Sequence, residues 1–139
     1  MATLCPGPYP SPVPAGWTPP KSRSGGSVSV ESPDGTSTFV TALRPMEPER
    51  FAAYDRDAAP SGTVLADHRD PCSTGTVHRV DVQIGNQISE VSIGLVHHFA
   101  YRYVYTRPAS HEADTGAERA LTAFCRPFSP LPTGSASPA

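Results

Sequence analysis

The chain has 139 residues, a formal net charge of -2 and a pI near 6.2. This length suits one domain with a core of its own and is too short for two ordinary domains. Eleven scattered basic residues against thirteen acidic ones exclude the basic surface of a nucleic-acid binder, and no apolar run approaches the roughly 18 residues of a membrane span.

Prolines gather at both ends of the chain: seven of the seventeen lie within the first twenty residues, and four follow Arg126. Because proline fixes φ and removes a backbone donor, neither end can enter a sheet interior or a long helix. We therefore expect a flexible tail at residues 1–15, one domain at residues 16–128 and a disordered tail at residues 129–139.

The N-terminus lacks a basic segment followed by an apolar one, and the three cysteines show no CxxC spacing. These features are typical of a cytoplasmic protein with reduced thiols. The alternative is a secreted or lipid-anchored protein from which a signal peptide has been removed.

The domain begins with a predicted hairpin. Residues 27–31 and 37–43 are rich in β-forming side chains, and the Asp34-Gly35 pair between them is a frequent hairpin turn. Trp17, the single tryptophan, is expected to seal one end of the core.

A helix is predicted over residues 49–58, because Pro48 suits the first turn of a helix. Its charged residues, Asp55 among them, are expected to face outward, opposite a narrow apolar stripe. That stripe consists of Phe51, Tyr54 and Ala58. A short strand at residues 63–66 and a polar loop at residues 67–75 are expected to follow.

The last predicted element is a second helix. Thr115 and Glu118 have the spacing of a capping box. An apolar stripe at helical spacing follows them, formed by Ala117, Ala120, Leu121, Phe124 and Cys125. The order of elements predicts an α+β fold, in which an antiparallel sheet of about five to six strands has two main helices packed on it.

Residues 77–106 predict three consecutive antiparallel strands joined by two-residue turns at Gly85-Asn86 and His97-His98. With these turns, Val80 pairs with Val91 and Asp81 with Glu90. In the same register Gly94 pairs with Tyr101, whose ring would cover the bare backbone of the glycine.

This register sorts the three strands into two faces, because side chains alternate along a strand. An aliphatic face is the expected floor of the core, with the second helix as its cover. It collects Val80, Val82, Ile84, Val91, Ile93, Leu95, Ala100 and Val104. The other face is aromatic and polar, and collects Arg79, Asp81, Glu90, Ser92, Gly94, Phe99, Tyr101, Tyr103 and Tyr105.

The pairing of Asp81 with Glu90 places like charges directly across a strand pair, which is destabilising. Arg79 lies on the same face and is expected to bridge the two carboxylates, whereas Arg102 lies on the opposite face. The competing interpretation is a polar spot kept for a partner or an ion.

No motif indicates a reaction, a metal or a cofactor. The five histidines lack the spacing of a zinc site, and a G-x-S-x-G nucleophile elbow and a phosphate-binding glycine loop are both absent from the sequence. A nucleophilic role for Cys72 with a distant histidine is formally possible and has no further support.

The order of short motifs resembles the PsbP/DcrB-like superfamily. The motifs are PAGW, TFVTAL, EPERFAAY, YRYVYTRP and ERALTAFC, spread over residues 14–128. The resemblance implies an antiparallel sheet with helices on its faces and a non-enzymatic role as an adaptor or chaperone. The sequence departs from the family at His97-His98, where a small glycine-containing turn is common, and it lacks the signal peptide of the lipoprotein members.

The leading functional hypothesis is a protein-binding domain that holds a protein partner on its aromatic and polar sheet face. The residues expected to bind are Arg79, Asp81, Glu90, Phe99, Tyr101, Tyr103 and Tyr105, since tyrosine and arginine are enriched at interface hot spots. The competing view is that a helix covers this face and the tyrosines are packing residues.

One alternative is a small-ligand binder or an enzyme with a pocket between the sheet and the first helix. Its candidate polar groups would be Asp81, Glu90, Tyr105 and His78, although the register puts His78 on the opposite face from the carboxylates. Another alternative is a structural subunit of a larger assembly.

Overall fold

The structure, a computed structural model, describes residues 16–18, 27–72 and 75–122 with their side chains. Strands β1 (Ala2–Leu4), β2 (Ser11–Val13) and β3 (Lys21–Ser22) are described by their backbone alone. Cys5, Phe124, Cys125 and the expected tail at residues 129–139 lie outside the described residues. Within the expected N-terminal tail, β1 and β2 form a separate antiparallel pair.

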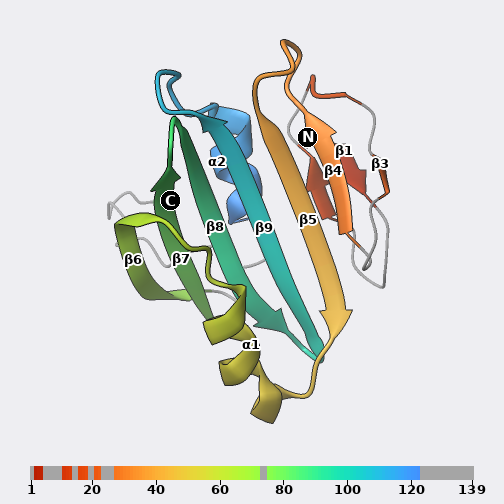
Figure 1. Cartoon of the computed structure of the whole chain (residues 1–139). Helices are drawn as coiled ribbons and strands as arrows, with labels where there is room; N and C mark the ends of the chain where they lie inside the picture. Colours follow the sequence, from red (N-terminus) through yellow and green to blue (C-terminus); the bar gives the residue numbers. More distant parts are fainter. Residues whose placement is uncertain are drawn as a thin grey trace, which may run out of the picture.

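The main body is an antiparallel sheet of seven strands in the order β3-β4-β5-β9-β8-β7-β6 (Figure 1). Its long strands are β4 (Ser27–Glu31), β5 (Thr38–Pro45), β6 (Thr63–Cys72), β7 (Gly75–Ile84), β8 (Gln87–Val96) and β9 (Phe99–Pro108). Two short helices, α1 (Phe51–Ala58) and α2 (Thr115–Leu121), pack against it, and a 3-10 turn at Pro48–Arg50 leads into α1. The α+β class with an antiparallel sheet is therefore confirmed.

The predicted three-stranded meander is confirmed in its register. Val80 pairs with Val91, Asp81 with Glu90, and Gly94 with Tyr101. Each of the two tight turns begins with a residue at positive φ, which is 61° at Gly85 and 55° at His97. Positive φ at the first central position is what the hairpin turns that match strand twist require.

The predicted loop at residues 67–75 is wrong, because β6 continues to Cys72 and pairs with β7 along its length. Nearly all of its side chains are exposed or half-buried, so the strand has no apolar alternation for sequence reasoning to detect. A register shift at Leu65 interrupts the pairing, and Pro71 lies near its end. A bulge, a proline and charged side chains are the usual protection of a sheet edge.

The prediction that the second helix covers the aliphatic face of the sheet is also wrong. Figure 1 shows α1 and α2 on opposite sides of the sheet, with α1 near its lower end. Ala117, Ala120 and Leu121 of α2 pack into one cluster with the tyrosines of β9, so α2 covers the aromatic face. The aliphatic face instead meets α1, where Arg102 donates from Nε to the carbonyl oxygen of Ala58 at 2.9 Å.

The principal core therefore lies between α2 and the aromatic face. Tyr101, Tyr103 and Tyr105 are at most 1% exposed, and Phe39 and Val30 of the neighbouring strands complete the layer. The expected role of Trp17 agrees with its position, since its ring meets Tyr105 edge-on with centroids 6.0 Å apart.

The start of α2 differs from the predicted capping box. Asp114 is the N-cap, and its Oδ2 accepts from the backbone N–H of Ala117 at 2.9 Å. The backbone N–H of Asp114 in turn donates to the Tyr105 hydroxyl at 2.8 Å. Asp114 thus replaces Thr115 as the cap, which leaves the Glu118 carboxyl available for another contact.

The described residues contain no helix that is long and apolar enough to cross a membrane.

Gly94 is a position at which the fold leaves no room for a side chain, because a Cβ there would overlap the ring of Tyr101. We predict that Gly94→Ala lowers the free energy of unfolding by about 2 kcal/mol, measured by urea denaturation. Tyr101→Leu makes room for the added methyl group, so the double variant should lose less stability than the sum of the two single variants. Additive losses would contradict the predicted overlap.

Candidate functional site

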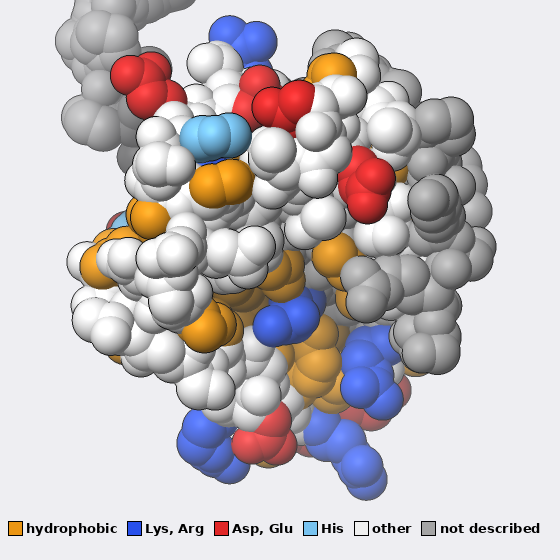
Figure 2. Space-filling model, turned by 45° about the horizontal axis from the view of Figure 1, so that its top comes forward, with side chains coloured by type: hydrophobic (Ala, Val, Ile, Leu, Met, Phe, Trp, Pro, Cys, Tyr) orange, Lys and Arg blue, Asp and Glu red, His pale blue; other side chains and the backbone are white. Residues whose placement is uncertain are grey.

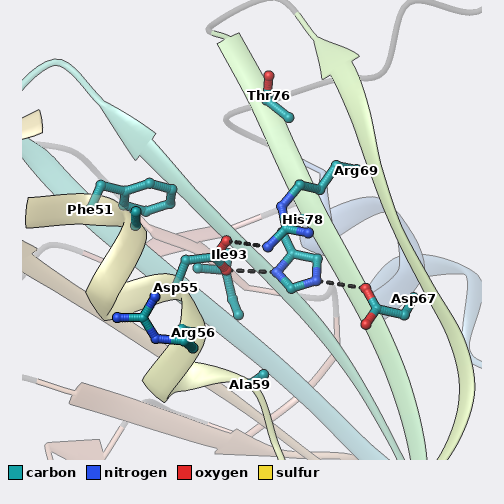
Figure 3. A pocket seen from close by; sticks show the side chains of 10 residues that line it. Phe51, Asp55, Arg56, Ala59, Asp67, Arg69, Thr76, His78 and Ile93 are labelled. Atoms are coloured by element: carbon teal, nitrogen blue, oxygen red, sulfur yellow. Dashed lines mark hydrogen bonds and ion pairs between the residues drawn. The ribbon is translucent and has the colours of Figure 1, made fainter. Parts of the chain in front are cut away.

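A cleft of about 680 Å³ opens between α1 and the β6–β7 edge of the sheet. Figure 3 shows Phe51, Asp55 and Arg56 reaching it from α1, His78 from β7, and Asp67 with Arg69 from β6. Clefts of roughly 300 to 1,000 Å³ with a few convergent polar groups are the usual form of small-ligand sites. This cleft is the candidate functional site.

The imidazole of His78 lies between two carboxylates and closes one side of the cleft. Its Nδ1 is 2.6 Å from Oδ1 of Asp55, and its Nε2 is 2.7 Å from Oδ1 of Asp67 (Figure 3). A carboxylate only accepts, so both contacts are hydrogen bonds when both ring nitrogens carry hydrogen. Nη2 of Arg69 donates to Oδ2 of Asp55 at 2.8 Å. Two anions and two cations then balance within this network.

Burial separates the four residues into an inner and an outer pair. Asp55 and His78 are each 5% exposed, whereas the side chains of Asp67 and Arg69 are 50% and 57% exposed. A buried charge is tolerated where it is paired and hydrogen-bonded, which is the case for the inner pair. The outer pair leaves polar atoms at the rim of the cleft.

The prediction that Asp55 faces outward is wrong. Asp55 follows Phe51 by four residues, so the two side chains lie on the same face of α1, and that face meets the sheet. A charged residue at such a position is normally assigned to solvent. His78 and Arg69 supply the partners that make its burial possible.

Asp67 and Arg69 are absent from the predicted site residues, because the sequence predicts a loop for their segment. On the observed strand they are two residues apart, so both point to the α1 side of the sheet. The sequence does contain a signal for His78, because side chains alternate along β7. His78 lies two residues before Val80, so both side chains point to the same face of the sheet. Of the four polar groups that the sequence suggested for a pocket beside the first helix, only His78 lines this cleft.

The expected partner-binding residues lie on the other face of the sheet, beneath α2. Tyr101, Tyr103 and Tyr105 are buried, so they do not form an exposed docking face. Phe99, Arg79 and Asp81 are half-buried and Glu90 is buried. The interpretation in which a helix covers this face is the one that the structure supports.

Asp81 and Glu90 are bridged as expected, since Nη2 of Arg79 lies 3.6 Å from a carboxylate oxygen of each. Arg107, to which no role is assigned from the sequence, also donates from Nη2 to Oε2 of Glu90 at 3.1 Å. Burial, together with a hydrogen bond from Glu118 and its charge, raises the pKa of Glu90 to about 7, while Arg107 opposes the shift. Burial likewise raises the pKa of Asp81, against the lowering effect of Arg79.

The aliphatic face is only partly covered by α1. Val40, Ala42 and Val104 on this face are half-buried. Figure 2 shows hydrophobic side chains at the floor of a hollow in the middle of the molecule. Most basic side chains in that view gather in its lower half, and the acidic ones mainly in its upper half.

Cys72 is disulfide-bonded, so the expectation that this thiol is reduced is wrong. It is buried in the core beside Val77, and the other two cysteines of the chain lie outside the described residues. Since the sulfur is already in a disulfide, Cys72 is not available as the nucleophile that the sequence left possible. Among the described residues, no group of three or more His, Cys, Asp or Glu is placed to hold a metal ion.

No protein-family model matches the chain, and no curated protein matches it. The resemblance to the PsbP/DcrB-like superfamily therefore stays a prediction, and function has to be argued from the cleft itself.

Removing one member of the buried network should be costly, because it leaves the others charged and unpaired. We predict that Asp55→Ala lowers the free energy of unfolding by about 3 kcal/mol in urea denaturation. Asp57→Ala, an exposed position on the same helix, is the matched control and should change it by less than about 0.5 kcal/mol. Equal effects of the two substitutions would show that the network does not hold α1 in place.

Proposed function

We propose that the domain is a binding protein that takes up a small ligand with an apolar body in the cleft between α1 and the sheet. The observation that carries the proposal is the convergence of α1, β6 and β7 on one cleft of about 680 Å³. We do not propose that a partner docks on the tyrosine face, because α2 packs on that face.

The lining of the cleft indicates the kind of ligand. Phe51, Ala52 and Ala59 supply apolar surface against which a ring or an alkyl chain can pack. Polar atoms stand at its border, among them the hydroxyl of Thr76 and the half-exposed carboxylate of Asp67. A ligand with an apolar body and one polar end matches this distribution.

The geometry favours binding over catalysis. A general base needs a free ring nitrogen within reach of the substrate, and both nitrogens of His78 already face carboxylates. The buried carboxylate of Asp55 is likewise engaged, by His78 and Arg69. Groups that neutralise one another in this way shape a cleft without supplying a reactive atom.

We further propose that the domain works in an oxidising compartment, which corresponds to the secreted or lipid-anchored alternative. The disulfide at Cys72 supports this, because disulfides persist mainly outside the reducing cytosol.

Thiol counting on the purified protein tests the compartment proposal. With three cysteines and one disulfide, protein isolated from its native host and denatured without reductant should react with one equivalent of alkylating reagent. After reduction it should react with three. Three reactive thiols before reduction would contradict an oxidising compartment.

Two neighbouring alanines of α1 test the binding proposal. Both are exposed, but only Ala52 lines the cleft, so Ala52→Trp should fill it and Ala53→Trp should not. Titration with the apolar fluorophore 1-anilinonaphthalene-8-sulfonate should give saturable binding to the unmodified protein and to Ala53→Trp. Ala52→Trp should bind at least about tenfold more weakly, a loss of ~1.4 kcal/mol. Equal affinities for the two tryptophan variants, or no saturable binding to the unmodified protein, would contradict the proposal.

A further inference from the structure

The charges that line the cleft between α1 and the sheet do not balance. Four of the charged residues form the hydrogen-bonded network around the imidazole, namely Asp55, Asp67, Arg69 and His78. Arg56 also lines the cleft, is exposed, and takes no part in that network. With the imidazole charged, as its two carboxylate partners require, three cations stand against two anions. The lining therefore carries one positive charge in excess.

The guanidinium group of Arg56 has no carboxylate partner within the protein. All thirteen acidic residues of the chain lie in the part that the structure describes. None of them forms an ion pair or a hydrogen bond with Arg56 there. A guanidinium group presents several N–H donors in one plane, and this geometry matches the oxygens of an anionic group such as a carboxylate. Arg56 is thus free to bind an anion from outside the chain.

Arg56 lies between the apolar side chains that α1 contributes to the cleft. Ala52 precedes it by four residues and Ala59 follows it by three, so the three side chains share one side of the helix. All three line the cleft, as does Phe51. An anionic group bound by Arg56 would therefore hold the rest of its molecule against apolar surface.

The two carboxylates that line the cleft are already neutralised by their own partners. Asp55 is 5% exposed and is in contact with both His78 and Arg69. Asp67 is half-exposed, but it lies across the imidazole from α1, with its Oδ1 at 2.7 Å from Nε2 of His78 (Figure 3). On the α1 side of the cleft, the unpaired charge that a ligand meets is the guanidinium group of Arg56.

The other charged side chains of α1 and of the turn before it lie outside the cleft. They are all exposed, and none of them lines it: Glu47, Glu49, Arg50 and Asp57. Arg50 carries the same charge as Arg56 on the same segment of the chain, so it offers a matched control for the loss of one positive charge.

We propose that the ligand of the cleft is an apolar anion, such as a carboxylic acid with a ring or an alkyl chain, and that Arg56 binds its charged end. This inference rests on the proposed function and specifies the charge of the ligand. One negative charge on the ligand balances the one positive charge in excess. An uncharged ligand of the same shape would cover the apolar wall and leave the guanidinium group unpaired, and a cation would meet a like charge.

Two probes with the same ring system separate the charge of a ligand from its apolar body. 1-Anilinonaphthalene-8-sulfonate carries a sulfonate, and N-phenyl-1-naphthylamine lacks it. In fluorescence titrations of the whole chain, Arg56→Gln should bind the sulfonate at least about fivefold more weakly than the unmodified protein does. Its affinity for the uncharged probe should stay within about twofold. Arg50→Gln should bind both probes as the unmodified protein does, because Arg50 lies outside the cleft.

Two results would overturn the inference. One is equal affinity of Arg56→Gln and Arg50→Gln for the sulfonate, and the other is an equal loss of affinity for both probes in Arg56→Gln. In either case the proposed function stands, provided that Ala52→Trp still weakens the binding of both probes and Ala53→Trp does not. If neither probe binds saturably, or if the two tryptophan variants bind both probes equally well, the proposed function fails and the inference fails with it.

Discussion

The register of β7, β8 and β9 decides which side chains meet on each face of the sheet, and both charge clusters depend on it. Two-residue turns at Gly85-Asn86 and His97-His98 set this register. A slip of one residue would exchange the faces of every side chain on a strand. In the observed register His78 reaches α1 on one side, while Glu90 lies beneath α2 on the other.

The charged clusters around His78 and around Glu90 neutralise their buried carboxylates with different partners. Around His78, two carboxylates face the imidazole and Arg69, so the network balances when the ring is doubly protonated. Around Glu90, the guanidinium groups of Arg79 and Arg107 approach the carboxyl groups of Glu90 and Asp81. The first arrangement suits a fixed wall of a binding cleft, and the second joins three neighbouring strands of the sheet through their side chains.

The sequence predicted those parts of the fold that local pattern determines. Turn chemistry and alternation placed the three central strands, and the pairing of Gly94 with Tyr101 followed from them. The stripe of Ala117, Ala120 and Leu121 predicted a buried helix face correctly, but a stripe does not say which face of a sheet it will meet. Both faces of the sheet carry apolar side chains, and α2 packs on the face that carries the tyrosines.

The candidate site was harder to predict because its residues break local expectations. Asp55 is a charged residue on a short helix, and only the tertiary partners His78 and Arg69 explain its burial. Asp67 and Arg69 lie on a polar edge strand, which has no hydrophobic period. A strand of this kind is recognised only through its pairing with β7, which the polar side chains of the segment do not indicate.

The most direct test of the central claim is the hydrogen-bonding state of the His78 ring, observed by long-range ¹H–¹⁵N NMR near neutral pH. The account predicts that both ring nitrogens carry hydrogen and that both N–H protons are protected from exchange, because Asp55 and Asp67 accept from them. A ring with one bare nitrogen, or with rapidly exchanging protons, would contradict the network that shapes the cleft.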